Sequence, residues 1–182
     1  MVVGAGKVAE SKVAGLLKTG CILHVVAPQA TGQIEAWSRK GKLRWHKRRY
    51  RDSDLAGCFL VVAATPSTKL HEKIFRAARK RRIICNVVDV PELCDFYYPA
   101  VVERGWLQIA ISTSGKSPAL AQRLRKDLEA RFGPEYKEWL AQLGKQRQRI
   151  RAEETVPSSL KVRLHQLATE ESFQQFLKSR KK

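Results

Sequence analysis

The sequence predicts an α/β fold in which a doubly wound parallel sheet is followed by a small α+β segment and a C-terminal helical domain. Short apolar runs alternate with helical patterns over the first part of the chain, which is typical of βαβ units. A glycine-rich turn separates the first of these runs from the first helical pattern. Beyond Phe132 only helical periodicity remains.

The first part of the chain predicts five strands with helices between them. The strands are expected at 1–3, 22–27, 42–47, 59–64 and 83–88, and the helices at 8–17, 34–40 and 70–80. Gly20 is expected to end the first helix, because glycine readily adopts the left-handed conformation found there. The charged range 42–47 predicts an edge strand, whereas the apolar range 59–64 predicts a buried strand.

The pattern changes after the fifth strand. Pro91 and Pro99 bracket a loop rich in Asp, Cys and aromatic residues, one further strand is expected at 106–111, and helices are expected at 118–132, 135–151 and 158–178. We therefore predict a nucleotide-binding domain at 1–98, a dimerisation segment at 99–131 and a helical domain at 132–182. The middle segment predicts a homodimer, because it has too few strands to bury its apolar face alone.

Composition indicates a globular, strongly basic protein. Hydrophobic residues make up 43% of the 182 residues, and no apolar run approaches the roughly 20 residues of a membrane span. The start shows no signal-peptide pattern, so we expect a cytoplasmic protein with no membrane role. Lys and Arg total 35 against 17 Asp and Glu, and the net charge of +18 predicts a polyanionic partner. Nucleic acid, a substrate with many carboxylates and a merely solubilising surface all fit this charge.

The glycine-rich turn has the context of a dinucleotide-binding fingerprint, because it follows a strand and opens a helix. Gly4 allows the tight turn, Gly6 lets the backbone approach a pyrophosphate, and the small Ala9 packs helix against strand. The N–H groups at the helix start would hold the phosphates. The sequence thus predicts a Rossmann-like domain, with a purely structural turn as the alternative.

Two features of the sequence near this turn limit the prediction of a dinucleotide-binding domain. The second strand ends in Ala27, Pro28 and Gln29, without the carboxylate that usually binds the ribose, so the motif does not separate NAD from NADP. Met1 also stands only shortly before Gly4, which makes the first strand short. We expect an upstream extension of this strand to stabilise the protein.

Asn86 and Asp89 stand at the carboxyl end of the predicted strand 83–88, where open α/β sheets bind their ligands. Asp89 is a candidate general base or metal-binding carboxylate. The alternative is that it caps a turn before Pro91.

A hydroxyl-rich loop precedes the helix that begins at Pro118. It resembles a phosphate loop, but Ala110 occupies the position of the first glycine, so we reject an ATPase. A helix start with Pro and preceding hydroxyls suits an anion such as a substrate carboxylate. The candidate residues are Ser112, Thr113, Ser114, Lys116 and Ser117.

Cysteines and histidines predict no metal site. The four cysteines contain no C-x-x-C pair and are expected to be small buried residues in a reducing compartment, and the four histidines, expected at the surface or in packing, lack metal-ligand spacing. The basic and aromatic range 39–51 fits a charged edge strand better than a nucleic-acid patch.

Taken in order, these motifs resemble the precorrin-2 dehydrogenase family, which includes stand-alone dehydrogenases, fused sirohaem synthases and forms that also insert iron. The resemblance is carried by 2–12, 25–28, 60–65, 86–89 and 111–121, and is loosest from Phe132 onward. It implies a Rossmann domain, a segment whose strands join across a two-fold axis, and an active site between the domains of the dimer. It also implies that Lys7, Val8, Pro28 and Gln29 contact NAD.

The family resemblance implies that the chain oxidises precorrin-2, an anionic tetrapyrrole, to sirohydrochlorin with NAD. Asp89 matches the key acidic residue, and Thr65 matches a position near the cofactor. Asn86 and the hydroxyl-rich loop are expected to bind substrate. One alternative is a bifunctional enzyme that also takes Fe²⁺ as a substrate, since Asp89 would serve either reaction. The other is a non-enzymatic NAD-binding sensor that contacts nucleic acid through its basic surface, although nucleic acid is not the partner we expect.

Overall fold

The computed structural model describes residues 1–154 and 156–180. The chain divides into two compact units, Met1–Tyr97 and Tyr98–Lys182. The finer division of the second unit at Phe132 stays a prediction.

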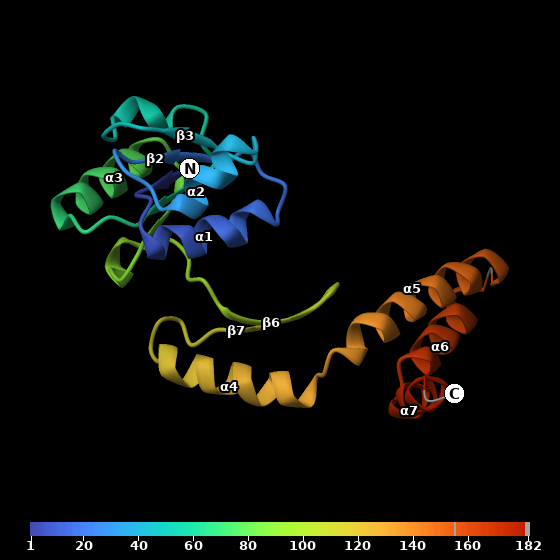
Figure 1. Cartoon of the computed structure of the whole chain (residues 1–182). Coiled ribbons are helices and arrows are strands. Elements are labelled where there is room, and N and C mark those ends of the chain that lie inside the picture. The colour runs from blue at the N-terminus through green and yellow to red at the C-terminus, as the bar shows by residue number, and fades with distance from the viewer. Residues whose placement is uncertain (155, 181–182) are drawn as a thin grey trace. The chain divides into compact units, whose positions relative to one another are not determined.

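The first unit is built on a five-stranded parallel sheet with the order β3-β2-β1-β4-β5 (Figure 1). Its strands are β1 (Val2–Val3), β2 (His24–Val26), β3 (Arg44–His46), β4 (Leu60–Ala63) and β5 (Ile84–Val87). Strand order reverses between β1 and β4, so the carboxyl ends of these strands form the switch point at which such sheets bind ligands.

Helices cover both faces of this sheet. They are α1 (Lys7–Leu17), α2 (Gly32–Arg39) and α3 (Thr68–Lys80), with short 3₁₀ helices η1 (Asp52–Leu55) and η2 (Pro91–Leu93). Val2 packs in a core with residues of α1 and α2, whereas its neighbour Val3 packs in a second core with residues of α3. Alternate side chains of one strand therefore serve two cores. The predicted doubly wound α/β fold is confirmed.

The second unit begins with an antiparallel strand pair and continues in helices. Its elements are β6 (Ala100–Arg104), β7 (Leu107–Ile111), α4 (Pro118–Arg131), α5 (Glu135–Glu153), α6 (Pro157–Leu167) and α7 (Glu170–Ser179). Val102 of β6 is fully buried, and Arg104 donates from Nε to the carbonyl of Phe132 and from Nη2 to that of Glu129. These bonds tie β6 to the end of α4. No described helix is long and apolar enough to cross a membrane.

Two expectations for this unit are wrong. Strand β6 was not expected, because its five residues include Glu103 and Arg104 and only Val102 is buried. The strand forms because it pairs with β7 across a turn in which Gly105 has a left-handed conformation. The single helix expected at 158–178 is two helices, since the hydroxyl of Thr169 accepts from Ser172 N and starts a new one.

The expectation for the cysteines is correct only in part. Cys85 is buried, Cys58 and Cys94 are half-buried, and Cys21 is exposed, so Cys21 does not behave as a buried hydrophobe. Burial raises the pKa of the Cys85 thiol to about 12, which keeps it protonated at neutral pH.

Candidate functional site

Gly4 makes the closest backbone approach at the candidate site. Its φ is +104°, and a Cβ added there would collide with the carbonyl oxygen of Ala64 and lie 2.7 Å from the carbonyl carbon. Gly4 N donates to Val26 O at 3.0 Å. The loop therefore fits between the ends of β2 and β4 only because residue 4 has no side chain.

The amino end of α1 is the opening that suits a phosphate. Gly6 is the N-cap and supplies no side-chain acceptor, whereas α2 is capped by Thr31 and α3 by Ser67. A Cβ added at Gly6 would meet nothing within 4 Å, so open space lies beside this backbone. The N–H groups at the start of α1 can thus face an anion, aided by the positive end of the helix dipole.

Residues 7 and 8 lie at the opening, whereas residue 9 lies in the core. Lys7 and Val8 are exposed on the first turn of α1, with Val8 50% exposed, and Ala9 is fully buried. Lys7 and Val8 are therefore available to a cofactor, and Ala9 supports the helix against the sheet as a small residue should.

The segment after β2 runs beside the glycine loop. Thr31 N donates to Ala5 O at 3.0 Å, and both Pro28 and Gln29 are exposed. Ala27 is fixed at both backbone atoms, because its N–H donates to His46 O and its carbonyl accepts from Trp45 Nε1. Pro28 and Gln29 thus leave a rigid strand end and face solvent at the edge where a ribose would lie.

After β4 the loop is held by a histidine whose role the sequence did not reveal. His71 is 6% exposed, and its Nε2 accepts from Thr65 N at 3.3 Å. The Thr65 hydroxyl in turn accepts from Ser67 N. Because Thr65 Cγ2 lies 3.2 Å from the position of a Cβ on Gly4, this bonding also supports the glycine loop. His71 was expected only as a surface or packing residue, and its place on the first turn of α3, near Thr65, was the only signal.

Asn86 is buried, and its side chain bonds to the chain itself. It is 6% exposed, and its amide nitrogen donates to Phe96 O at 2.8 Å. Nearby, Asp95 accepts from Cys85 N and pairs with Arg79 at 3.4 Å. These bonds fold the segment after β5 back onto the strand. Asn86 thus shapes this loop, and a substrate contact by its side chain stays a prediction.

Asp89 is the exposed carboxylate of that loop. It has a φ of +61°, the left-handed conformation that Asp tolerates better than most residues. Val88 N donates to Ala63 O and Val90 N to Val87 O, so the turn that carries Asp89 is fixed by backbone bonds. Within the described part of the chain, the Asp89 carboxylate makes no hydrogen bond that would cap this turn. A strained, outward-facing carboxylate suits a functional role.

Lys12 is a second residue that motif analysis missed. It is half-buried on α1, and burial lowers the pKa of its ammonium while the Asp89 carboxylate acts in the opposite direction. Lys12 and Asp89 therefore lie within electrostatic range of each other. Lys12 follows Val8 by one helical turn, and this spacing could have indicated that both face the strand ends.

The hydroxyl-rich loop lies in the second unit and is shaped by its own hydroxyls. Ser117 caps α4 by accepting from Leu120 N, Thr113 Oγ1 accepts from Ser117 N, and Ser112 Oγ accepts from Ser114 N. Ser114 has a positive φ of 50°. Lys116 is exposed. Each hydroxyl that accepts these bonds keeps its own O–H, which can be donated to a carboxylate.

The structure thus places the predicted site residues in two groups. The first unit holds Gly4, Gly6, Lys7, Val8, Ala9, Pro28, Gln29, Thr65, Asn86 and Asp89, all at or just beyond the carboxyl ends of its strands except the helical residues of α1. The second unit holds Ser112, Thr113, Ser114, Lys116 and Ser117. Among the described residues, no group of three His, Cys, Asp or Glu could hold a metal ion.

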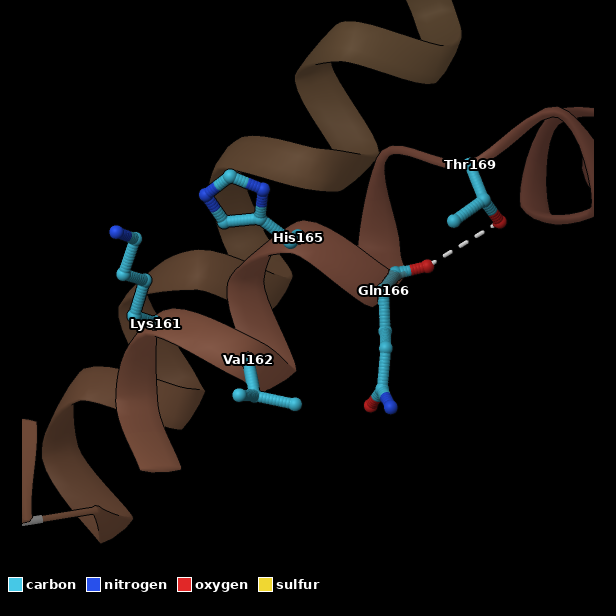
Figure 2. A pocket seen from close by; sticks show the side chains of 5 residues that line it. All are labelled: Lys161, Val162, His165, Gln166 and Thr169. Carbon is cyan, nitrogen blue, oxygen red and sulfur yellow. Dashed lines mark hydrogen bonds between the residues drawn. The ribbon is translucent and has the colours of Figure 1, made fainter. Parts of the chain in front are cut away.

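Two hollows elsewhere do not resemble a catalytic centre. One of about 630 Å³ lies at the amino ends of β1, β2 and β4, opposite the glycine loop. The other, of about 470 Å³, lies on α6 (Figure 2). There the side chains of Lys161 and His165 point to one side of the helix and those of Val162 and Gln166 to another, so they do not converge on a ligand.

Comparisons with known proteins agree over both units. Residues 1–100 match the family described as "Putative NAD(P)-binding", and residues 104–131 match the family described as "Sirohaem biosynthesis protein central". The siroheme synthase of Nitrosococcus oceani is 38% identical over 129 residues, covering 71% of this chain and 28% of that protein. The siroheme synthase of Pseudomonas entomophila is 39% identical over 152 residues, covering 84% and 33%.

A solved structure, SirC, a precorrin-2 dehydrogenase, is similar with a TM-score of 0.82 and 27% identity, covering 98% of this chain and 91% of that one. The chain therefore spans about a third of the length of the curated siroheme synthases, but nearly all of this solved dehydrogenase.

Proposed function

This chain belongs to the NAD(P)-binding family of sirohaem-biosynthesis proteins, and on that premise we propose that it oxidises precorrin-2 to sirohydrochlorin with NAD. The resemblance inferred from the motifs is confirmed at the level of the family. The observation that carries the activity is the uncapped start of α1 beside the open space at Gly6, with Asp89 exposed beyond the end of β5, two strands from β1 in the same sheet.

The residues of the first unit fit a dinucleotide. The N–H groups of the first turn of α1 would hold the pyrophosphate, and Gly4 admits the close approach of β4 that shapes the loop. Thr65, fixed by His71, and the exposed pair Pro28 and Gln29 would contact the remainder of the cofactor. The bound NAD supplies a hydride acceptor, and that difficult part of the chemistry belongs to the cofactor.

The reaction removes one hydride and one proton from precorrin-2. Asp89 is the group that would accept the proton or orient the macrocycle, because its carboxylate is exposed at the strand end and makes no hydrogen bond within the described chain. Lys12 lies within electrostatic range of Asp89 and places a basic side chain near the group that would accept the proton. The protein thus contributes alignment, charge and a proton acceptor.

Substrate carboxylates require cationic and hydrogen-bonding partners. Lys116 and the hydroxyls of Ser112, Thr113 and Ser117 would supply them from a loop whose backbone is already fixed. The net charge of +18 would draw a polyanionic tetrapyrrole toward the protein.

Homodimer formation is part of the proposal. The pair β6 and β7 is a separate two-stranded sheet, so each strand has an edge without a strand partner in the described chain. An isolated pair of strands is at best marginally stable, and Val101 is 37% exposed on its open face. A second copy that joins this sheet would cover both features.

The test is anaerobic incubation of the full chain with precorrin-2 and NAD⁺. Sirohydrochlorin and NADH should appear in equal amounts, and added Fe²⁺ then shows whether the chain also inserts iron. Tight NAD binding without tetrapyrrole oxidation, together with DNA binding that weakens steeply with salt, would contradict the proposal and favour a sensor.

A further inference from the structure

The adenosine end of the cofactor site lacks the group that selects NAD. Sites specific for NAD usually carry a carboxylate after the second strand, which binds the ribose hydroxyls and repels a 2′-phosphate. Here the strand is followed by Pro28 and Gln29, and the next acidic residue is Glu35, on α2. The described segment between β2 and α2 therefore carries no carboxylate that would oppose an additional phosphate.

A lysine lies beside this strand end. Strands β2 and β3 are parallel with Val26 opposite His46, and Ala27 N donates to His46 O at 3.2 Å. The next residue along each strand is Ala27 on one side and Lys47 on the other. Lys47 is thus the neighbour of the residue that leads into Pro28.

The side chain of Lys47 is directed by a tryptophan that is itself fixed. Trp45 Nε1 donates to Ala27 O at 3.0 Å, so the indole is held against the end of β2. The Lys47 Nζ lies 5.6 Å from the centroid of the Trp45 ring. The ammonium therefore lies over an indole that is bonded to the end of β2, while it remains exposed to solvent.

Lys47 differs from the adjacent Arg48 in its charge partners. Arg48 donates from both Nη atoms to Asp54, at 2.9 and 2.6 Å, and is committed to that carboxylate. Lys47 has no carboxylate partner in the described part of the chain. An exposed ammonium of this kind is available to a phosphate.

We propose that Lys47, beside the exposed Pro28 and Gln29, forms a subsite for the 2′-phosphate of an adenine dinucleotide, so that the chain accepts NADP as well as NAD. The proposal deepens the proposed function and rests on the same placement of the cofactor along α1. It makes Lys47 a residue that determines cofactor specificity and gives it no part in the hydride or proton transfer.

The experiment measures the binding of NAD and NADP to the full chain by calorimetry, without tetrapyrrole. Adenosine 2′,5′-bisphosphate and AMP serve as probes of the adenosine end alone. NADP should bind within about tenfold of NAD, and the bisphosphate should bind more tightly than AMP.

Two variants and a control locate the subsite. Lys47→Glu should lower the affinity for NADP by about tenfold or more, because only NADP carries the extra phosphate. The affinity for NAD should change by less than about threefold. Lys42→Glu makes the same charge change at an exposed lysine before the amino end of β3, and it should leave the ratio of the two affinities unchanged. Gln29→Asp should restore preference for NAD.

The outcomes separate this proposal from the activity. The subsite is refuted if NADP binds about a hundredfold more weakly than NAD. It is also refuted if Lys47→Glu and Lys42→Glu weaken NADP binding equally. Either result would stand even if precorrin-2 is oxidised with NAD. Selective loss of NADP binding in Lys47→Glu supports the subsite even if no tetrapyrrole is oxidised.

Discussion

The two units differ in how completely they bury their apolar residues. In the first, two clusters lie on opposite faces of the sheet, and the side chains of Val2, Val25, Val61 and Ile74 are fully buried. In the second, Val102 is the only fully buried residue among those described, while Trp106 is 90% exposed. The first unit therefore completes its own core, and the second presents surface that another molecule could cover.

This difference assigns separate tasks to the units. A rigid sheet can hold a cofactor, because the strand ends and the start of α1 are fixed by packing on both faces. An incompletely buried strand pair suits assembly and the binding of a large substrate. Changes in the first unit should therefore alter cofactor binding, and changes in β6 and β7 should alter the oligomeric state.

Gly4→Ala should have the largest effect. The new Cβ collides with Ala64 O at a φ that only glycine adopts easily, so the loop must move. We expect NAD affinity to fall by about a hundredfold or more, together with a lower melting temperature. Gly15→Ala on α1 is the matched control, because a Cβ there meets nothing within 4 Å and should raise stability by about 0.5–1 kcal/mol.

Equal NAD affinity in the Gly4→Ala and Gly15→Ala variants would contradict the placement of the cofactor beside the glycine loop. Calorimetric titration and thermal unfolding of both variants would decide the point.

Val101→Lys tests the second unit. The change places a charge on the open face of β6, and we expect the dimer dissociation constant to rise by about tenfold or more while NAD binding is retained. Sedimentation at several concentrations measures the effect. A wild-type chain that sediments as a monomer at micromolar concentration would refute the proposed dimer.

His71→Ala should have an intermediate effect on the first unit. Loss of the acceptor for Thr65 N leaves a backbone donor unpaired beside the glycine loop, and NAD affinity should fall by about tenfold. His71→Gln keeps a hydrogen-bond acceptor and should recover part of the loss. His165→Ala in the second unit is the control. Unchanged NAD affinity in His71→Ala would show that the Thr65 loop does not contact the cofactor.

The smallest effect concerns alkaline stability. The folded-state pKa of Cys85 is raised to about 12 from an ordinary value near 9, so the unfolded thiol ionises first as the pH rises. The contribution of the Cys85 thiol to the free energy of unfolding is therefore fully present below pH 9 and is lost progressively between pH 9 and pH 12. Cys85→Ala should flatten this part of a pH titration of the unfolding free energy, whereas Cys21→Ala should leave it unchanged.

Much of the first unit could be predicted because its signals are local. Strand 59–64 is apolar throughout, and Gly4 and Gly6 stand between a strand and a helix, so pattern and motif pointed to the same fold. His71 and Lys12 left only weak local signals, since their roles depend on Thr65 and Asp89, which approach them only in the folded sheet.

The second unit was harder to predict for the same reason. Strand β6 exists through its register with β7, and its single buried residue leaves a weak period-2 pattern. The division between α6 and α7 depends on one hydroxyl, that of Thr169, in a sequence whose periodicity continues across it. Elements stabilised mainly by tertiary pairing leave little trace in local patterns.

The most direct test of the central claim compares turnover and cofactor affinity in Asp89→Ala. Because Asp89 would transfer the proton or orient the substrate and the glycine loop would bind NAD, precorrin-2 oxidation should fall by about a hundredfold or more while NAD affinity changes little. Asp89→Asn, which keeps the shape but cannot act as a base at neutral pH, separates proton transfer from orientation. Wild-type turnover by a folded Asp89→Ala variant, with its circular dichroism unchanged, would contradict the account.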